Sequence, residues 1–268
     1  MNSTYLPEHD AGWKYNLPKP NDPTLPIASI LRIRTNKSND TYIEIPRSTT
    51  QVRGIAISGA VAVLAFFLLG IAPSLYHLLS SPYSSRLDVT LTFLVLIPCA
   101  IYAISPLVRM DIETPRDEPI RFNRDRQKVY FYEYRYHLFN IFNRKLWGVK
   151  PVAYNWQDLT AEAYSLYAPM GYGGLIESVK IAVHDPDTGQ IIDRLFFSQG
   201  IHLGTDRWEA VRLYMQRRDV GSVEFGPPPY GIDLVDHPNP FIRIAPKVQW
   251  PADMDLESRT APGSEEKS

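Results

Sequence analysis

The sequence predicts a membrane-anchored α+β protein, in which a two-helix transmembrane hairpin carries a mostly antiparallel β domain with one C-terminal amphipathic helix. Two long uncharged segments follow one another between residues 54 and 108. On both sides of them lie short alternating or aromatic-rich runs that are separated by turn-forming residues. A final stretch with helical apolar spacing follows these runs and supplies the amphipathic helix.

The composition narrows the class of protein. The chain has 268 residues, of which 12% are aromatic, and this is ample for a packed core. A formal net charge of -1 argues against a dedicated nucleic-acid-binding protein, because such domains are normally strongly basic. The single cysteine, Cys99, excludes an intramolecular disulfide. The N-terminus lacks the apolar run of a cleavable signal peptide, so we expect the mature chain to begin near Met1.

Residues 1–52 are predicted to be a cytoplasmic segment with a proline-rich start and a short β hairpin. The stretch IASILRIRTNKSNDTYIEI, residues 27–45, shows one strand, a polar turn and a second strand. We expect this hairpin to pair with the β domain that follows the membrane segments.

Residues 53–109 are predicted to be the transmembrane hairpin. Residues 54–85 and 89–108 contain no Lys, Arg, Asp or Glu, and the first segment exceeds the roughly 20 residues that cross a bilayer. Neither segment shows the polar face of a helix in a water-soluble protein. Lys and Arg are concentrated before the first segment and after the second, while the turn has only Arg86. This bias predicts a multi-pass protein with both termini in the cytoplasm.

Residues 110–225 are predicted to form the cytoplasmic β-rich domain. PIRFN and KVYFYEY form one hairpin across RDRQ, and VAYNWQDLTAEAYSLY supplies one or two further strands. ESVKIAVHD and QIIDRLFFS form another hairpin across PDTG. Several short strands followed by one helix resemble a pleckstrin-homology-like (PH-like) barrel or roll, a likeness that concerns architecture alone.

The helix of this domain is predicted to begin at Asp206, which with Glu209 resembles a capping box. Trp208, Val211 and Met215 give it one apolar face. Residues 226–268 are rich in proline at first and lack any period, so they are predicted to be an extended segment that ends in a disordered tail.

Catalytic and metal-binding patterns are not found in the sequence. The histidines are isolated, and neither HExxH nor GxSxG occurs. HDPDTG resembles the start of a calcium loop, but Gly189 and Phe196 occupy later ligand positions, so a hairpin turn is the better interpretation. We therefore expect no cofactor, no metal and no catalytic residue, and binding in place of catalysis. An enzyme assembled from residues distant in sequence remains an alternative.

Four basic residues are the candidate contact site for a membrane surface or a partner: Arg121, Arg124, Arg126 and Lys128. They lie in PRDEPIRFNRDRQKVYFYEYR, residues 115–135, where aromatic residues alternate with polar ones. A strand pair close to an anionic membrane leaflet is the first interpretation, because each Lys or Arg near such a leaflet contributes about 1 kcal/mol. Recognition of a protein partner comes second, and nucleic acid last.

The order of these features resembles a proteobacterial family of unknown function. The resemblance rests on the two apolar segments, PRDEPIRFNR followed by KVY, YNWQDLTAEA and RWEAVRLYMQ, and it covers roughly residues 25 to 255. Genes of that family often lie in type VI secretion clusters. The resemblance implies a bacterial inner-membrane protein that acts as an immunity or accessory protein for a cognate effector or secretion component. The alternative is a membrane-anchored PH-like module that binds lipid headgroups or scaffolds other membrane proteins.

Overall fold

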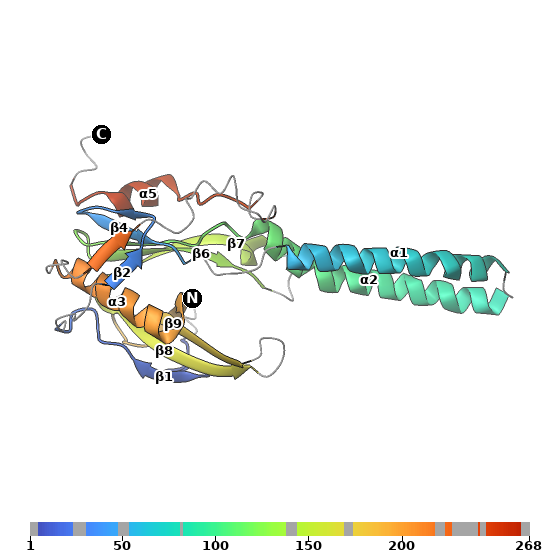
Figure 1. Cartoon of the computed structure of the whole chain (residues 1–268), viewed down its shortest axis with the longest axis horizontal. Coiled ribbons are helices and arrows are strands. Elements are labelled where there is room, and N and C mark those ends of the chain that lie inside the picture. The colour runs from blue at the N-terminus through green and yellow to red at the C-terminus, as the bar shows by residue number, and fades with distance from the viewer. Residues whose placement is uncertain are drawn as a thin grey trace.

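The computed structural model shows an α+β protein in which a β-sheet body carries a long pair of helices that projects from one side (Figure 1). It describes residues 5–23, 31–47, 54–80, 83–137, 144–168, 174–217, 223–226, 241 and 245–263. Two larger antiparallel sheets and one two-stranded sheet form the body. The predicted α+β class with mostly antiparallel strands is therefore confirmed.

The first sheet has five strands in the order β3-β4-β5-β6-β7. The strands are β3 (Lys37–Ser38), β4 (Tyr42–Ile45), β5 (Ile120–Asn123), β6 (Lys128–Arg135) and β7 (Gly148–Asn155). The hairpin of β5 and β6 across residues 124–127 is confirmed. The expected pairing of the N-terminal region with the later domain is also confirmed, because β4 pairs with β5.

The second sheet has the order β1-β8-β9-β10. Its strands are β1 (Trp13–Asn16), β8 (Leu159–Ala168), β9 (Gly174–His184) and β10 (Ile191–Gln199). A 3-10 turn, Trp156–Asp158, carries the chain from β7 into β8 and so from one sheet to the other. The predicted hairpin across PDTG is confirmed by the pairing of β9 with β10.

One predicted pairing is wrong. The N-terminal hairpin was expected to join a strand near residue 31 directly to one near residue 42, but β2 (Leu31–Arg34) pairs in parallel with β11 (Val223–Gly226). The hairpin partner of β4 is the two-residue strand β3. A parallel partner almost two hundred residues away leaves no local signal, so the sequence pattern favoured the nearer strand.

The core lies between the two larger sheets, and α3 (Ile201–Met215) closes it (Figure 1). Phe122, Trp156, Phe197 and Trp208 meet there with ring centroids 5.0 to 6.5 Å apart. Fully burying a side chain of this size contributes about 1.5–3 kcal/mol. The helix starts at Ile201, five residues before the predicted capping box, because Gly200 with a φ of 72° turns the chain directly out of β10.

The projecting helices are α1 (Ile55–Ser80) and α2 (Tyr83–Glu113), and they pack side by side (Figure 1). The predicted connection between them was longer, since α2 begins at Tyr83 and not near Val89. Pro73 lies within α1, and Pro98 and Pro106 lie within α2, and both helices continue through them.

The C-terminal region differs from the expected extended segment and disordered tail. Residues Ala252–Arg259 form the helix α5, which lies against the outer face of the five-stranded sheet (Figure 1). Among the described residues, α5 is therefore a helix of the body that the sequence did not predict. An eight-residue helix is too short to be stable alone, so its sequence carries little helical signal and its contacts with the sheet stabilise it.

Candidate functional site

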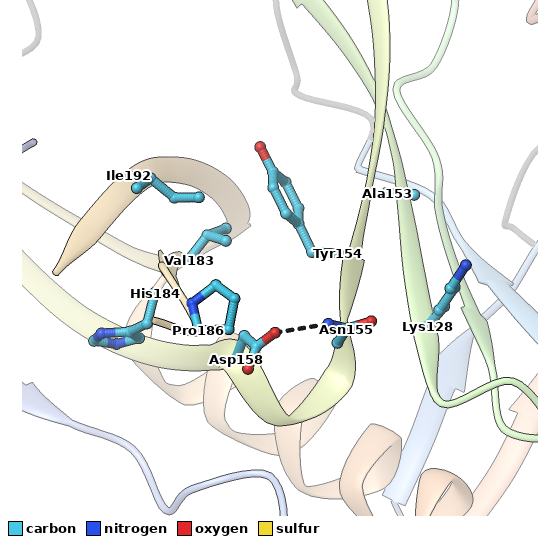
Figure 2. A pocket seen from close by; sticks show the side chains of 9 residues that line it. All are labelled: Lys128, Ala153, Tyr154, Asn155, Asp158, Val183, His184, Pro186 and Ile192. Carbon is cyan, nitrogen blue, oxygen red and sulfur yellow. Dashed lines mark hydrogen bonds between the residues drawn. The ribbon is translucent and has the colours of Figure 1, made fainter. Parts of the chain in front are cut away.

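A shallow pocket of about 230 Å³ opens between the two sheets beside the 3-10 turn (Figure 2). Tyr154 of β7 lies on one side of it, and Val183 and Ile192 lie on the other (Figure 2). The Tyr154 hydroxyl donates a hydrogen bond of 3.1 Å to Asp193. Burial and this carboxylate raise the pKa of Tyr154 to about 12, so the hydroxyl stays protonated at neutral pH.

The other polar groups around this pocket are already engaged. Both ring nitrogens of His184 have partners at 3.1 Å, namely the Gly189 carbonyl and the Thr160 hydroxyl. Asn155 donates to the Asp158 carboxylate at 2.9 Å (Figure 2). These side chains therefore form their hydrogen bonds with other groups of the protein itself.

Within the described ranges, no group of three or more His, Cys, Asp or Glu side chains is placed to hold a metal ion. The HDPDTG stretch is a turn, in which the Asp185 carboxylate accepts hydrogen bonds from the backbone N–H groups of Asp187 and Thr188.

The four basic residues of the candidate contact site, which we call the basic strip, lie together at the β5–β6 hairpin. Arg121 is buried and is held by Glu44 at 2.5 Å and Asp255 at 2.6 Å. Lys128, on the neighbouring strand, pairs with Glu257 at 2.8 Å. The Lys128 ammonium holds the pKa of the Glu257 carboxyl below its ordinary value.

The other two members of the strip lie in the turn between the strands. Arg124 lies 5.0 Å from the ring centre of Tyr214 and contacts Asp40 at 3.4 Å. Arg126 donates to the carbonyl oxygen of Thr260 at 2.9 Å. Three of the four strip residues therefore contact the chain's own C-terminal segment, residues 245–263.

This C-terminal segment covers the outer face of the five-stranded sheet. Trp250 lies between Arg121, whose guanidinium is 4.5 Å from its ring centre, and Tyr132, whose ring is 5.2 Å away. At the end of α5, the Asn123 amide donates to the carbonyls of Ser258 and Thr260 at 3.2 and 2.9 Å. These bonds satisfy carbonyl groups that a helix end leaves without partners. The strand β5 and most of β6 are thus buried on both faces.

Sequence reasoning missed this arrangement, although a signal was present. In ADMDLESR the acidic residues Asp253, Asp255 and Glu257 alternate along a short stretch, opposite in charge to the basic strip. Alternation in β5 showed that Arg121 lies on the face opposite Phe122, but alternation alone does not say whether that second face is covered.

Arg47 is a second buried arginine and ties the two sheets together. It donates to the Tyr132 carbonyl of β6 at 2.9 Å and to the Phe196 carbonyl of β10 at 2.8 Å. Its ion pair with Glu133 measures 2.8 Å. Its backbone N–H donates to Asp117, a carboxyl whose pKa burial raises. In PRDEPIRFNR, the stretch on which the family resemblance rests, Asp117 and Arg121 therefore make buried structural contacts.

At the base of the pair, a buried carboxylate near the end of α2 holds the first turn of α1. Asp111 of α2 accepts hydrogen bonds from the backbone N–H groups of Gly54, Ala56 and Ile57 at 3.2, 3.0 and 3.1 Å. A negative charge at this position satisfies the open donors of the first turn of α1 and interacts favourably with its dipole.

Aromatic residues gather beside this base. The guanidinium of Arg109 lies 4.5 Å from the ring centre of Trp147. Tyr136 is 6.1 Å from Trp147 and 6.4 Å from Tyr134. Burial and the nearby Glu113 carboxylate raise the pKa of Tyr134 to about 12.

The α1–α2 pair carries large apolar side chains in exposed positions. Among the described residues one helical segment, Leu94–Glu113, is long and apolar enough to cross a membrane, and only 11% of its apolar window is buried. In α1 the described residues provide a shorter apolar stretch, Ile55–Phe66. The finer prediction of a two-helix membrane hairpin goes beyond this finding.

Comparison with known proteins gives one match. The family described as "Family of unknown function (DUF6708)" matches residues 97–233, from the second half of α2 to just beyond β11. Neither a curated protein nor a solved structure matches the chain. The matched region contains the basic strip and most of the body, but not α1 or the C-terminal segment. Because the match extends over more than half of the 268 residues, the chain belongs to DUF6708, a family of unknown function.

Proposed function

We propose that this protein is a membrane-anchored binding protein, in which the α1–α2 pair crosses the bacterial inner membrane as a hairpin and holds the β body at its surface. The observation that carries the proposal is the exposure of large apolar side chains along both helices, such as Phe66 at 76% and Leu94 at 68%. In water such a surface is unfavourable, whereas a bilayer core stabilises it.

The pairing of β4 with β5 supports a hairpin over a single crossing. The strand β4 precedes α1 and β5 follows α2, and the two strands are hydrogen-bonded neighbours in one sheet. Both ends of the helical pair therefore reach the same body. If the pair crosses a membrane, it does so twice and returns to its starting side.

The residues at the base favour the cytoplasm as that side. Arg109 and Trp147 are types that concentrate at membrane interfaces, Trp on both sides and Arg on the cytoplasmic side. Both chain termini are then cytoplasmic.

The body is proposed to act by binding another protein, and not by catalysis. The polar groups Tyr154, Asn155 and His184 around the pocket bond to other groups of the protein, and most of the basic strip is occupied by the C-terminal segment. The occupied strip favours protein binding over recognition of lipid headgroups. The resemblance to a family found in type VI secretion clusters suggests that the partner is a cognate effector or a secretion component. An immunity or accessory role follows from that suggestion.

Two experiments test the two parts of this proposal. Reporters fused after Ser268 and inserted between Ser81 and Ser85 are expected on opposite sides of the membrane, and reporters on the same side would refute the hairpin. The effector encoded beside the gene is then expressed with and without this protein. Survival only in the presence of the protein is the expected result. Equal killing in both cultures would refute the immunity role and leave the anchoring untouched.

A further inference from the structure

The β8–β9 hairpin extends past the core and ends in exposed apolar side chains. Leu166 pairs with Ile176 across the strands, and Tyr167 pairs with Leu175. These four side chains are 50%, 43%, 69% and 63% exposed. Neighbouring residues of a strand point to opposite faces, so both faces of the hairpin end are uncovered. We call these four residues the hairpin tip.

No charged residue occurs in the sequence of the hairpin end. The stretch LYAPMGYGGLI, from Leu166 to Ile176, contains no Asp, Glu, Lys, Arg or His. Exposed strand ends in water normally carry charged residues that prevent association with other chains. The first charged residue on the β9 side is Glu177, so the uncharged character ends where the strand returns to the body. This composition fits an apolar surrounding better than water.

The direction of the hairpin identifies that surrounding. In Figure 1 the β8–β9 hairpin points along the long axis of the molecule, in the same direction as the α1–α2 pair. Its end reaches close to the level at which the two helices leave the body. A membrane crossed by α1 and α2 would therefore meet the hairpin tip.

We propose that the hairpin tip inserts into the interfacial layer of the same membrane and gives the body a second, non-spanning attachment to lipid. This inference rests on the membrane anchoring proposed above. A lipid surface fits better than a protein partner, because leucine and isoleucine favour the acyl boundary and tyrosine favours the headgroup level. Two attachment points prevent the body from rotating about the helical pair, so one side of it always faces the membrane.

The test uses the full chain in lipid nanodiscs, with Cys99→Ser removing the only native thiol. A single cysteine that carries an environment-sensitive fluorophore is introduced as Leu175→Cys in the tip. Leu94→Cys on α2 reports the anchor, and Gln190→Cys in the exposed turn at the opposite end of β9 is the matched control. Lipids with a quencher near the headgroup or deep in the acyl chain are compared.

The label at residue 175 is expected to shift to the blue and to lose most of its fluorescence with the shallow quencher. The label at residue 94 should respond to the deep quencher, and the label at residue 190 to neither. A residue 175 label that behaves like the control, while the residue 94 label is quenched, overturns the tip insertion and leaves the anchor intact. A blue-shifted but unquenched residue 175 label indicates protein contact and also overturns it. If the residue 94 label is not quenched either, the anchoring itself fails.

Discussion

In the β body the side chains of Arg47 and Arg212 are 2% and 1% exposed, whereas in the α1–α2 pair Phe66 and Leu69 are 76% and 75% exposed. A water-soluble protein normally shows the reverse distribution, with charged groups outside and large apolar groups inside. In the body, carbonyl or carboxylate groups bond to each of these buried arginines and offset the cost of burying its charge. The apolar surface of the helical pair has no such partners among the described residues, and the membrane anchoring proposed above would account for this difference.

The largest effect is expected from breaking the buried charge of the body. Arg47→Met leaves Glu133 and three backbone carbonyls without their partner, and removing one member of a buried ion pair costs about 3–5 kcal/mol. Thermal unfolding of the purified full chain measures this loss. Arg32→Met is the control, because its side chain is 83% exposed and such pairs contribute about 0–1 kcal/mol. Equal effects of the two variants would show that burial does not distinguish these arginines.

The second largest effect is expected from a charge placed in the exposed apolar surface of the α1–α2 pair. Ile101→Arg places a charge near the middle of α2, where the side chain is 62% exposed, and a membrane helix pays about 2.5–3.5 kcal/mol for it. We expect less protein in the membrane fraction after extraction at high pH. Leu203→Arg, at a 47% exposed position of α3, should leave the amount of protein in the membrane fraction unchanged. If neither variant alters the fraction, the exposed apolar surface of the helices does not face lipid.

A more local effect, confined to the contacts of α5, is expected where the basic strip meets the acidic residues of the C-terminal segment. Arg121→Met removes hydrogen bonds to Glu44 and Asp255, and each bond to a charged group contributes about 1.5–3 kcal/mol. Hydrogen exchange in α5 should become faster, because the helix depends on these contacts. Lys128→Met, with a side chain that is 42% exposed, should accelerate exchange much less. Exchange that is equally fast in both variants would argue against Arg121 as the main contact.

The smallest effect is a loosening of the C-terminal segment in acid. The pKa of Glu257 in the folded chain lies below its ordinary value of 4.5, because Lys128 donates a hydrogen bond to the carboxylate. The Glu257–Lys128 contribution is therefore fully present above that ordinary value and is lost as the pH falls through the lower folded pKa. Hydrogen exchange of α5 should rise in that window. Glu257→Gln should reduce this rise, and an unchanged profile in the variant would exclude Glu257 as its source.

The sequence predicted the elements whose signals are local. The turns RDRQ and PDTG fix the β5–β6 and β9–β10 hairpins within a few residues, and the absence of charge marks the two long helices. The sequence did not predict the pairing of β2 with β11 or the docking of α5, because both depend on residues far apart in the chain. The PH-like architecture stays a prediction.

The basic strip shows why the candidate site was harder to interpret than the fold. Arg121 occupies the face that alternation assigns to solvent, yet Trp250 and Asp255 cover it. Periodicity separates the two faces of a strand but does not reveal a second layer that comes from another part of the chain. Charge complementarity between the strip and the α5 residues was the available signal.

The connection between β4 and β5 also has a consequence for synthesis. These neighbouring strands are separated in the chain by the whole α1–α2 pair, so β4 leaves the ribosome long before its partner. Because contacts of high sequence separation form slowly, β4 stays without its partner β5 until both helices have been synthesised. Insertion of the helices would bring Ile45 and Ile120 to one point on the membrane surface. The bilayer would then serve as the template on which this body begins to fold.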